Sequence, residues 1–227
     1  MTYPAGHRDE VKKRIVASAR RLFNRQGFEN VSVDRIMSGA GLTRGGFYSY
    51  FESKSELYAE VLGCFFTDPE WKSCWEGVEV DLKSAEVGPQ VVRAYLSRQH
   101  FEDVENSCPM VALPGDVTRS GDTARRAFET VFKAMVSVLE RSLEDGAHGT
   151  FRTRDGGNGS DRGRRRNGGG RHQVAQATAA LCVGGMVVAR ALENRALADE
   201  LRDACMAVAF DLGGWAGDVK NGKHKLP

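Results

Sequence analysis

The residues best suited to chemistry lie in one short stretch near the N-terminus. A segment that we predict to be a helix ending at Phe51 opens with Thr43, Arg44, Gly45 and Gly46. The planar guanidinium of Arg44 can donate two parallel hydrogen bonds to a guanine edge. Each glycine costs up to about 1 kcal/mol in a helix relative to alanine. Their use here indicates a backbone that must approach another molecule closely.

Three further polar side chains follow this helix start. Tyr48 and Tyr50 lie in its later turns, and Lys54 begins the next predicted helix. All three can reach phosphate oxygens, which would fix the register of a nucleic acid without reading its sequence. The alternatives are that Tyr48 belongs partly to the core and that Lys54 is an ordinary solvated charge.

The elements that position these residues are short helices. Apolar residues at three- and four-residue steps over 11–23 predict an amphipathic helix with a basic outer face, ending near Gly27. Ser32 is placed to cap a second short helix, Gly41 provides a turn, and Ser53 is placed to cap a fourth helix. Two short helices joined by a glycine-containing turn form a helix-turn-helix, whose second helix enters the major groove of DNA.

The overall charge of the chain says little about nucleic acids. The formal net charge is +2, but residues 152–171 contain seven arginines against two aspartates. The positive balance therefore comes from one unusual segment. The prediction of DNA binding rests on local patterning instead.

The termini and the cysteines exclude several classes of protein. The N-terminus has no apolar leader, and we expect no run of about 20 apolar residues that could cross a membrane. The five cysteines lack metal-ligand or disulfide-framework spacing. We therefore expect a cytoplasmic protein with no membrane partner, no metal and no cofactor. No nucleophile elbow, P-loop or metalloprotease motif occurs, so we expect no enzyme.

The remainder of the chain also has helical patterning. The segments predicted to be helices are 87–103, 109–119, 123–144, 172–193 and 198–215. Residues 145–171 are rich in glycine and arginine, and we expect them to form a mobile loop. The predicted fold is all-α, with a helix-turn-helix DNA-binding domain at 1–52 and a larger helical effector-binding and dimerisation domain at 53–227.

The run VSVDRIMSGAGLTRGGFYSYFESKSEL resembles the DNA-binding signature of the TetR family of bacterial transcriptional regulators. The resemblance covers about residues 12–62. It implies that the DNA-facing positions are Ser32, Val33, Thr43, Arg44, Gly45, Gly46, Tyr48, Tyr50 and Lys54. Val33 stands where the family commonly has Thr or Ser, so we expect no phosphate contact from that side chain.

The resemblance also implies a role for the C-terminal half. It implies a helical domain that dimerises through its last two helices and holds a pocket for a small-molecule effector. The segment 174–192 is apolar over most of its circumference and contains closely spaced small residues, which agrees with a helix buried by a partner. The alternative is the central core helix of a monomer. A two-fold protein would bind a palindromic operator in double-stranded DNA.

The effector cannot be identified from the sequence. The residues that could contact it are Phe65, Trp71, Trp75, Phe101, Cys108, Phe132 and Met135. Aromatic and methionine side chains at helical spacing are also typical of plain core.

Cys108 permits two interpretations. Pro109 suits the first position of a helix, which puts the Cys108 thiol beside a helix N-terminus, where the thiolate is favoured. One interpretation is a reactive cysteine that senses oxidants or electrophiles. The other is a small buried capping residue. The resulting hypothesis is a homodimeric repressor released from its operator by a small molecule, with a thiol-based sensor using Cys108 as the alternative.

Overall fold

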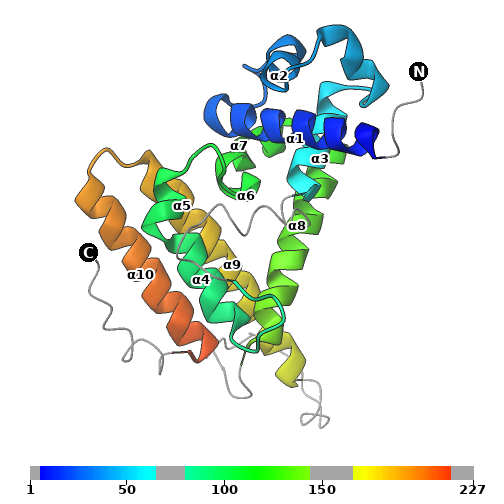
Figure 1. Cartoon of the computed structure of the whole chain (residues 1–227). Coiled ribbons are helices and arrows are strands. Elements are labelled where there is room, and N and C mark those ends of the chain that lie inside the picture. Colours follow the sequence, from blue (N-terminus) through cyan, green and yellow to red (C-terminus); the bar gives the residue numbers. More distant parts are fainter. Residues whose placement is uncertain (1–5, 65–79, 144–165, 216–227) are drawn as a thin grey trace. The chain divides into compact units, whose positions relative to one another are not determined.

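The chain is helical throughout the part that the structure describes (Figure 1). The structure is a computed structural model that describes residues 6–64, 80–143 and 166–215. Its helices are α1 (His7–Gln26), α2 (Val33–Gly39), the 3₁₀ helix η1 (Arg44–Ser49), α3 (Lys54–Cys64), α4 (Val87–Leu96), α5 (Arg98–Glu102), α6 (Pro109–Ala112), α7 (Pro114–Arg119), α8 (Asp122–Arg141), α9 (Arg166–Ala191) and α10 (Arg195–Gly213). The described residues contain no strand, and the predicted all-α fold is confirmed.

The chain divides into two compact units. Unit 1 comprises Met1–Cys74 and Glu102–Phe132, and unit 2 comprises Trp75–Phe101 and Lys133–Pro227. Helix α8 therefore contributes its first part to unit 1 and the remainder to unit 2. The domains predicted above divide the chain by role rather than by packing, and they stay a prediction.

Unit 1 is built around the apolar face of α1. Ile15, Ala19 and Phe23 are fully buried, as their three- and four-residue spacing predicts. They share one core with buried side chains of the neighbouring helices, namely Ile36, Met37, Phe47, Phe51, Leu57 and Tyr58. The ring of Phe23 meets the ring of Tyr58 edge to face, with centroids 5.5 Å apart. This core holds α2 and η1, which are too short to be stable by themselves.

The predicted ends of the first helices are confirmed. Ser32 Oγ accepts the Arg35 N–H at 3.3 Å at the start of α2. Ser53 Oγ accepts the Glu56 N–H at 3.1 Å at the start of α3. Helix α1 ends at Gln26, and the C-cap residue Gly27 has a φ of +77°, a conformation that residues other than glycine rarely adopt.

The two helices predicted between residues 87 and 119 are each broken once, so these predictions are wrong in detail. Ser97 has extended backbone, and its Oγ accepts the His100 N–H at 3.1 Å to begin α5. Pro114 separates α6 from α7 because proline donates no hydrogen bond and disfavours helical geometry at the preceding residue, Leu113.

Unit 2 contains α4, α9 and α10, which pack against one another (Figure 1). Gly185 of α9 lies against Cys205 of α10. A Cβ added at Gly185 would lie 2.8 Å from Cys205 Sγ, so a larger residue would push the two helices apart. The small residues predicted to allow close helix approach therefore do so at this position.

Helix α9 begins at Arg166, so the predicted loop over residues 145–171 is wrong at its C-terminal end. The Arg171 guanidinium donates to the carbonyl oxygens of Glu140, at 3.3 Å, and Leu143, at 2.6 Å. This anchor and the packed apolar helix that follows favour helical growth toward the N-terminus, since each added residue gains a hydrogen bond. Residues 145–165 of the predicted loop lie outside the described residues.

Helix α9 is also more apolar than expected. Residues 170–191 have a hydropathy of 1.5 in their most apolar window, which by length and composition alone would suffice to cross a membrane. Of this window 44% is buried inside the protein, and α9 packs against α4 and α10. Core helices of soluble proteins share this composition.

Candidate nucleic-acid interface

Helix α1 holds the turn that joins α2 to η1. Gly41 lies in this turn with a φ of +69°, which favours glycine. The Arg14 guanidinium donates to the carbonyl oxygen of Ala40, immediately before the glycine. Ser18 Oγ donates to the carbonyl oxygen of Ile36 at 2.8 Å. These contacts fix α2 and the start of η1 on the long first helix.

The predicted recognition helix differs from expectation in type and in length. It is a 3₁₀ helix that ends at Ser49, whereas the prediction was a helix through Phe51. Thr43 lies at its N-cap with extended backbone, as expected, but its side chain makes no capping hydrogen bond. Gly45 and Gly46 lower the stability of an α-helix. The six residues of η1 make a longer 3₁₀ helix than is common.

The start of η1 is open to solvent. Thr43, Arg44 and Gly45 are exposed, and Gly46 is half-buried. Tyr48 is 65% exposed and rests its ring edge to face on the buried Phe47, with centroids 5.3 Å apart. The interpretation of Tyr48 as partly core is therefore wrong. The hydroxyl-bearing ring projects from the same short helix as the Arg44 guanidinium.

The two glycines of η1 have no internal reason to be glycine. A Cβ added at Gly45 would meet nothing within 4 Å, and one added at Gly46 would meet only Met37 Cε at an ordinary 3.6 Å. Neither residue has a positive φ. Close approach by an external partner explains their presence better than packing or backbone geometry does.

Lys54 is engaged by the protein itself. Its Nζ donates to the carbonyl oxygens of Phe28, at 2.9 Å, and Val31, at 3.1 Å. It also lies 4.2 Å from the centroid of the Phe28 ring. The alternative of an ordinary solvated charge is therefore wrong. An ammonium has three protons, so one remains for a phosphate.

The other candidates are partly engaged. Tyr50 is half-buried under the guanidinium of Arg8, which also donates to the carbonyl oxygen of Ser49 at 3.0 Å. Ser32 uses its hydroxyl as the α2 cap, and Val33 packs against the core. Sequence reasoning missed Arg8, because a contact between residues 41 positions apart leaves no local pattern.

Arg44 has one charged partner in the described part of the chain. Its Nη1 lies 3.1 Å from Asp34 Oδ2 of α2. Both side chains are largely exposed, at 66% and 56%. An exposed ion pair contributes about 0–1 kcal/mol to stability. The ion pair therefore matters more for the orientation of the Arg44 guanidinium than for the stability of the fold.

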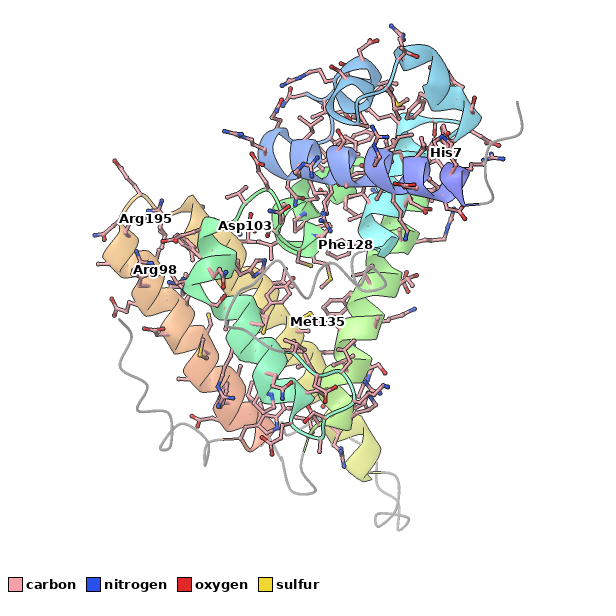
Figure 2. The ribbon with its side chains drawn as sticks, in the orientation of Figure 1. His7, Arg98, Asp103, Phe128, Met135 and Arg195 are labelled. Atoms are coloured by element: carbon pink, nitrogen blue, oxygen red, sulfur yellow. The ribbon has the colours of Figure 1, made fainter. Side chains whose placement is uncertain are left out.

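The candidate effector contacts do not gather at one described site. Met135 (Figure 2) and Phe101 are buried core residues of unit 2. Cys108 is buried in unit 1, and Phe132 is half-buried in unit 1. Phe65, Trp71 and Trp75 lie outside the described residues. The prediction that these residues contact an effector stays a prediction.

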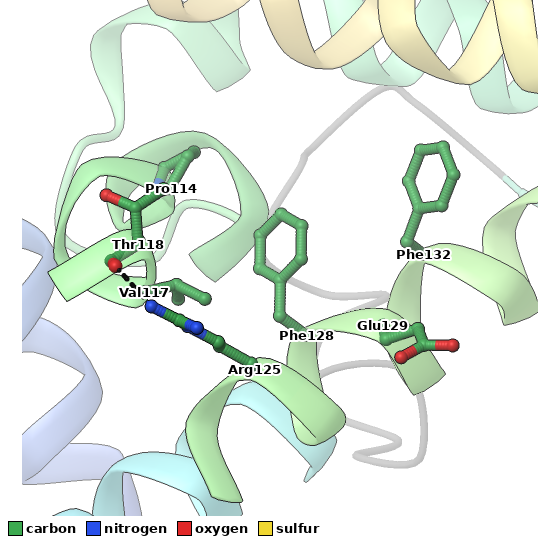
Figure 3. A pocket seen from close by; sticks show the side chains of 7 residues that line it. All are labelled: Pro114, Val117, Thr118, Arg125, Phe128, Glu129 and Phe132. Carbon is green, nitrogen blue, oxygen red and sulfur yellow. Dashed lines mark hydrogen bonds between the residues drawn. The ribbon is translucent and has the colours of Figure 1, made fainter. Parts of the chain in front are cut away.

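Phe132 does line a hollow between α7 and α8 in unit 1 (Figure 3). The hollow has a volume of about 470 Å³. It is lined by Pro114, Val117, Thr118, Arg125, Phe128, Glu129 and Phe132. Figure 3 shows the rings of Phe128 and Phe132 side by side on α8, with Arg125 donating to the carbonyl oxygen of Thr118 at 2.8 Å. The lining suits an apolar ligand with polar groups at its edge.

Cys108 lies at the N-cap of α6, as expected, and its side chain is fully buried. Helix α6 has only four residues. An oxidant dissolved in water therefore reaches this thiol only when the surrounding segments separate. The burial agrees with the interpretation of Cys108 as a small buried capping residue.

Comparison with known proteins identifies a family match in the helix-turn-helix segment. The family model described as bacterial regulatory proteins, tetR family, matches residues 15–61. The HTH-type transcriptional regulator TtgW of Pseudomonas putida is 32% identical over 94 residues, which are 38% of this chain and 70% of that protein. The HTH-type transcriptional regulator YdgC of Bacillus subtilis is 27% identical over 135 residues, or 60% of this chain. That alignment spans 65% of YdgC, slightly less than two thirds of its length.

The fold has relatives among solved structures. The reduced form of NemR from E. coli superposes with a TM-score of 0.62 at 17% sequence identity. The superposition covers 89% of this chain and 97% of NemR. At this identity the likeness concerns the fold alone, and it extends well beyond the segment that the family model matches.

Proposed function

This chain belongs to the tetR family of bacterial regulatory proteins, and on that premise we propose that it is a homodimeric transcriptional repressor. A small-molecule effector would release it from a palindromic operator in double-stranded DNA. The single observation that carries the proposal is the exposed start of η1, with Arg44 and two glycines that the protein's own packing does not require.

Sequence-specific reading follows from the chemistry of that surface. Arg44 supplies a guanidinium for a guanine edge, and Thr43 and Tyr48 supply hydroxyl groups. Gly45 and Gly46 let the backbone come close to a base or a phosphate. Lys54 and Arg8 flank the segment from α3 and α1, where they would contact phosphates and hold register.

Dimerisation is supported by an apolar face on unit 2. The large apolar side chains of Val188 on α9 and of Leu197 and Val208 on α10 are about half exposed. Small exposed residues, Ala180 and Gly184, lie on the same helix as Val188. A second copy packed on the last two helices would cover this face and give the two-fold symmetry that a palindromic operator requires.

The hollow in unit 1 supports control by a small molecule. Its α7 wall contains Val117 and Thr118, and the residue before them, Asp116, accepts the Phe28 N–H through Oδ2 at 2.8 Å. Phe28 follows the end of α1, in the connection to α2. A ligand that displaces α7 would therefore disturb the connection between the first two helices of the DNA reader. The effector would then favour the state in which the hydrogen bond between Asp116 and Phe28 is broken, which is the difference between two states that allosteric release requires.

The experiment is selection of bound fragments from genomic DNA by the full chain, followed by footprinting of the recovered site. We expect protection of a palindrome whose half-sites lie one helical turn, or a multiple of it, apart. Binding that is indifferent to sequence at moderate salt would refute the proposal.

Thiol-based sensing with Cys108 stays the alternative. The full burial of Cys108 counts against it, because a sensor cysteine must be accessible. Treatment of the DNA complex with hydrogen peroxide separates the two proposals. Release that Cys108→Ser abolishes would favour the thiol sensor, and release that persists in this variant would eliminate it.

A further inference from the structure

The ion pair between Asp34 and Arg44 has a consequence for base recognition. We propose that Asp34 is a positioning residue that sets the base preference of Arg44 by holding its guanidinium in one orientation. The inference rests on the proposed function, because it requires that the start of η1 reads DNA.

Asp34 lies on a helix, α2, that is held firmly by the core of unit 1. It lies in the first turn of α2, and two of the next three residues, Ile36 and Met37, pin that helix to the core of unit 1 with side chains at most 1% exposed. Arg44 is the first residue of η1, on the far side of the Gly41 turn. The carboxylate therefore provides a fixed reference point for a long side chain that would otherwise sample many rotamers.

The geometry leaves the guanidinium able to read a base. Arginine carries five N–H donors, and the contact at 3.1 Å joins Nη1 of Arg44 to Oδ2 of Asp34. Nη2 and Nε remain to donate to a pair of acceptors, such as O6 and N7 of guanine. A guanidinium without this restraint could turn instead to a phosphate, which carries no sequence information.

Charge also argues for a specific role. A carboxylate beside a DNA-binding surface repels phosphates, so it lowers affinity unless it does something else. Two other acidic side chains of unit 1 have partners within the protein: Glu60 pairs with Lys12 at 2.8 Å, and Glu56 accepts the Glu52 N–H at 2.6 Å. Asp34 is more than half exposed and fills no space in the core. Orientation of Arg44 is the function that its ion pair with Arg44 supports.

The test uses the full chain and the operator recovered by selection from random-sequence DNA. Dissociation constants are measured for this operator, for every single-base variant of one half-site, and for unrelated DNA. The proteins compared are the wild type, Asp34→Asn, Arg44→Ala and the double variant. Asp9→Asn is the matched control, because Asp9 is an exposed aspartate in the first turn of α1.

We expect Asp34→Asn to reduce the preference for one base at one position by about two- to fivefold, the range for an exposed ion pair. Affinity for unrelated DNA should not fall, because a negative charge has been removed. In the Arg44→Ala background, Asp34→Asn should leave the preference at that position unchanged. Asp9→Asn should change no base preference.

Three results would overturn the inference. The first is an unchanged base preference in Asp34→Asn. The second is a loss spread evenly over all positions. The third is a sharper preference with tighter operator binding, which would mean that Asp34 competes with DNA for Arg44. Absence of any sequence preference in the wild type would instead refute the proposed function, and the inference with it.

Discussion

Lys54 shows how one side chain can support both the fold and the interface. Its ammonium bonds two carbonyl oxygens of the α1 to α2 connection and leaves one proton outward. Charged hydrogen bonds contribute about 1.5–3 kcal/mol each in favourable cases. We expect Lys54→Met to lower the free energy of unfolding by about 1–3 kcal/mol and to weaken operator and unrelated DNA alike. Chemical denaturation and DNA titration measure the two effects.

Arg44→Ala is the matched comparison for Lys54→Met. Arg44 makes one exposed ion pair, so its loss should change stability by no more than about 0.5 kcal/mol. It should nevertheless relax base preference at one position. Equal effects of the two variants on stability would contradict the different roles given to them.

His100 makes stability depend on pH. It is fully buried in unit 2, its Nδ1 lies 2.7 Å from the carbonyl oxygen of Tyr95, and burial lowers its pKa from 6.5 to about 3. Below pH 6.5 the unfolded chain binds a proton that the folded chain does not, so acid favours unfolding. We expect His100→Asn to remove a slope of about 1.4 kcal/mol per pH unit between pH 6 and 4. Denaturant titrations at several pH values measure this slope, and identical slopes in both proteins would contradict the account.

At the scale of elements, Asp116 links α7 to the connection between α1 and α2. Its side chain is 14% exposed and accepts the Phe28 N–H, while it pairs with Arg119 at 2.8 Å. We expect Asp116→Ala to speed hydrogen exchange of the Phe28 amide and to weaken operator binding several-fold. Asp122→Ala, at the exposed start of α8, is the control. Unchanged exchange at Phe28 would show that α7 does not hold this connection.

The helices α1, α2 and α3 could be predicted because their sequence signals are local. The spacing of apolar residues defines the buried face of α1, and the helix ends follow from three capping residues, Ser32, Ser53 and Gly27. The break at Leu113 also has a local signal, because Pro114 disfavours helical geometry at the residue before it. The 3₁₀ form of η1 and the break at Ser97 leave no signal in the spacing of apolar residues, so that spacing alone does not predict them.

The sequence predicts which residues belong to the candidate site, but it does not predict the contacts that these residues make. The exposed positions of η1 follow from its register, whereas Lys54 with Phe28 and Arg44 with Asp34 join residues that only the folded chain brings together. The candidate effector contacts stay a prediction. Aromatic residues have the same spacing whether they fill a core, as Phe101 does, or line a hollow, as Phe132 does.

At the scale of the whole molecule, the proposed dimer gives a direct prediction. Val208→Glu places a charge on the exposed apolar face of α10 and should convert the dimer to a monomer. Val104→Glu is the control, since Val104 is also exposed but lies outside the last two helices. Sedimentation equilibrium should give twice the chain mass for the wild type and for Val104→Glu. A wild-type monomer, or a dimer that survives Val208→Glu, would contradict the proposed interface.

The central claim is that the chain distinguishes its operator from other DNA. The most direct measurement is the ratio of dissociation constants for the recovered operator and a scrambled duplex of equal length, at about 150 mM salt. We expect the operator to bind at least about 10³-fold more tightly and Arg44→Ala to reduce this ratio about tenfold. A ratio near one in the wild type would contradict the central claim.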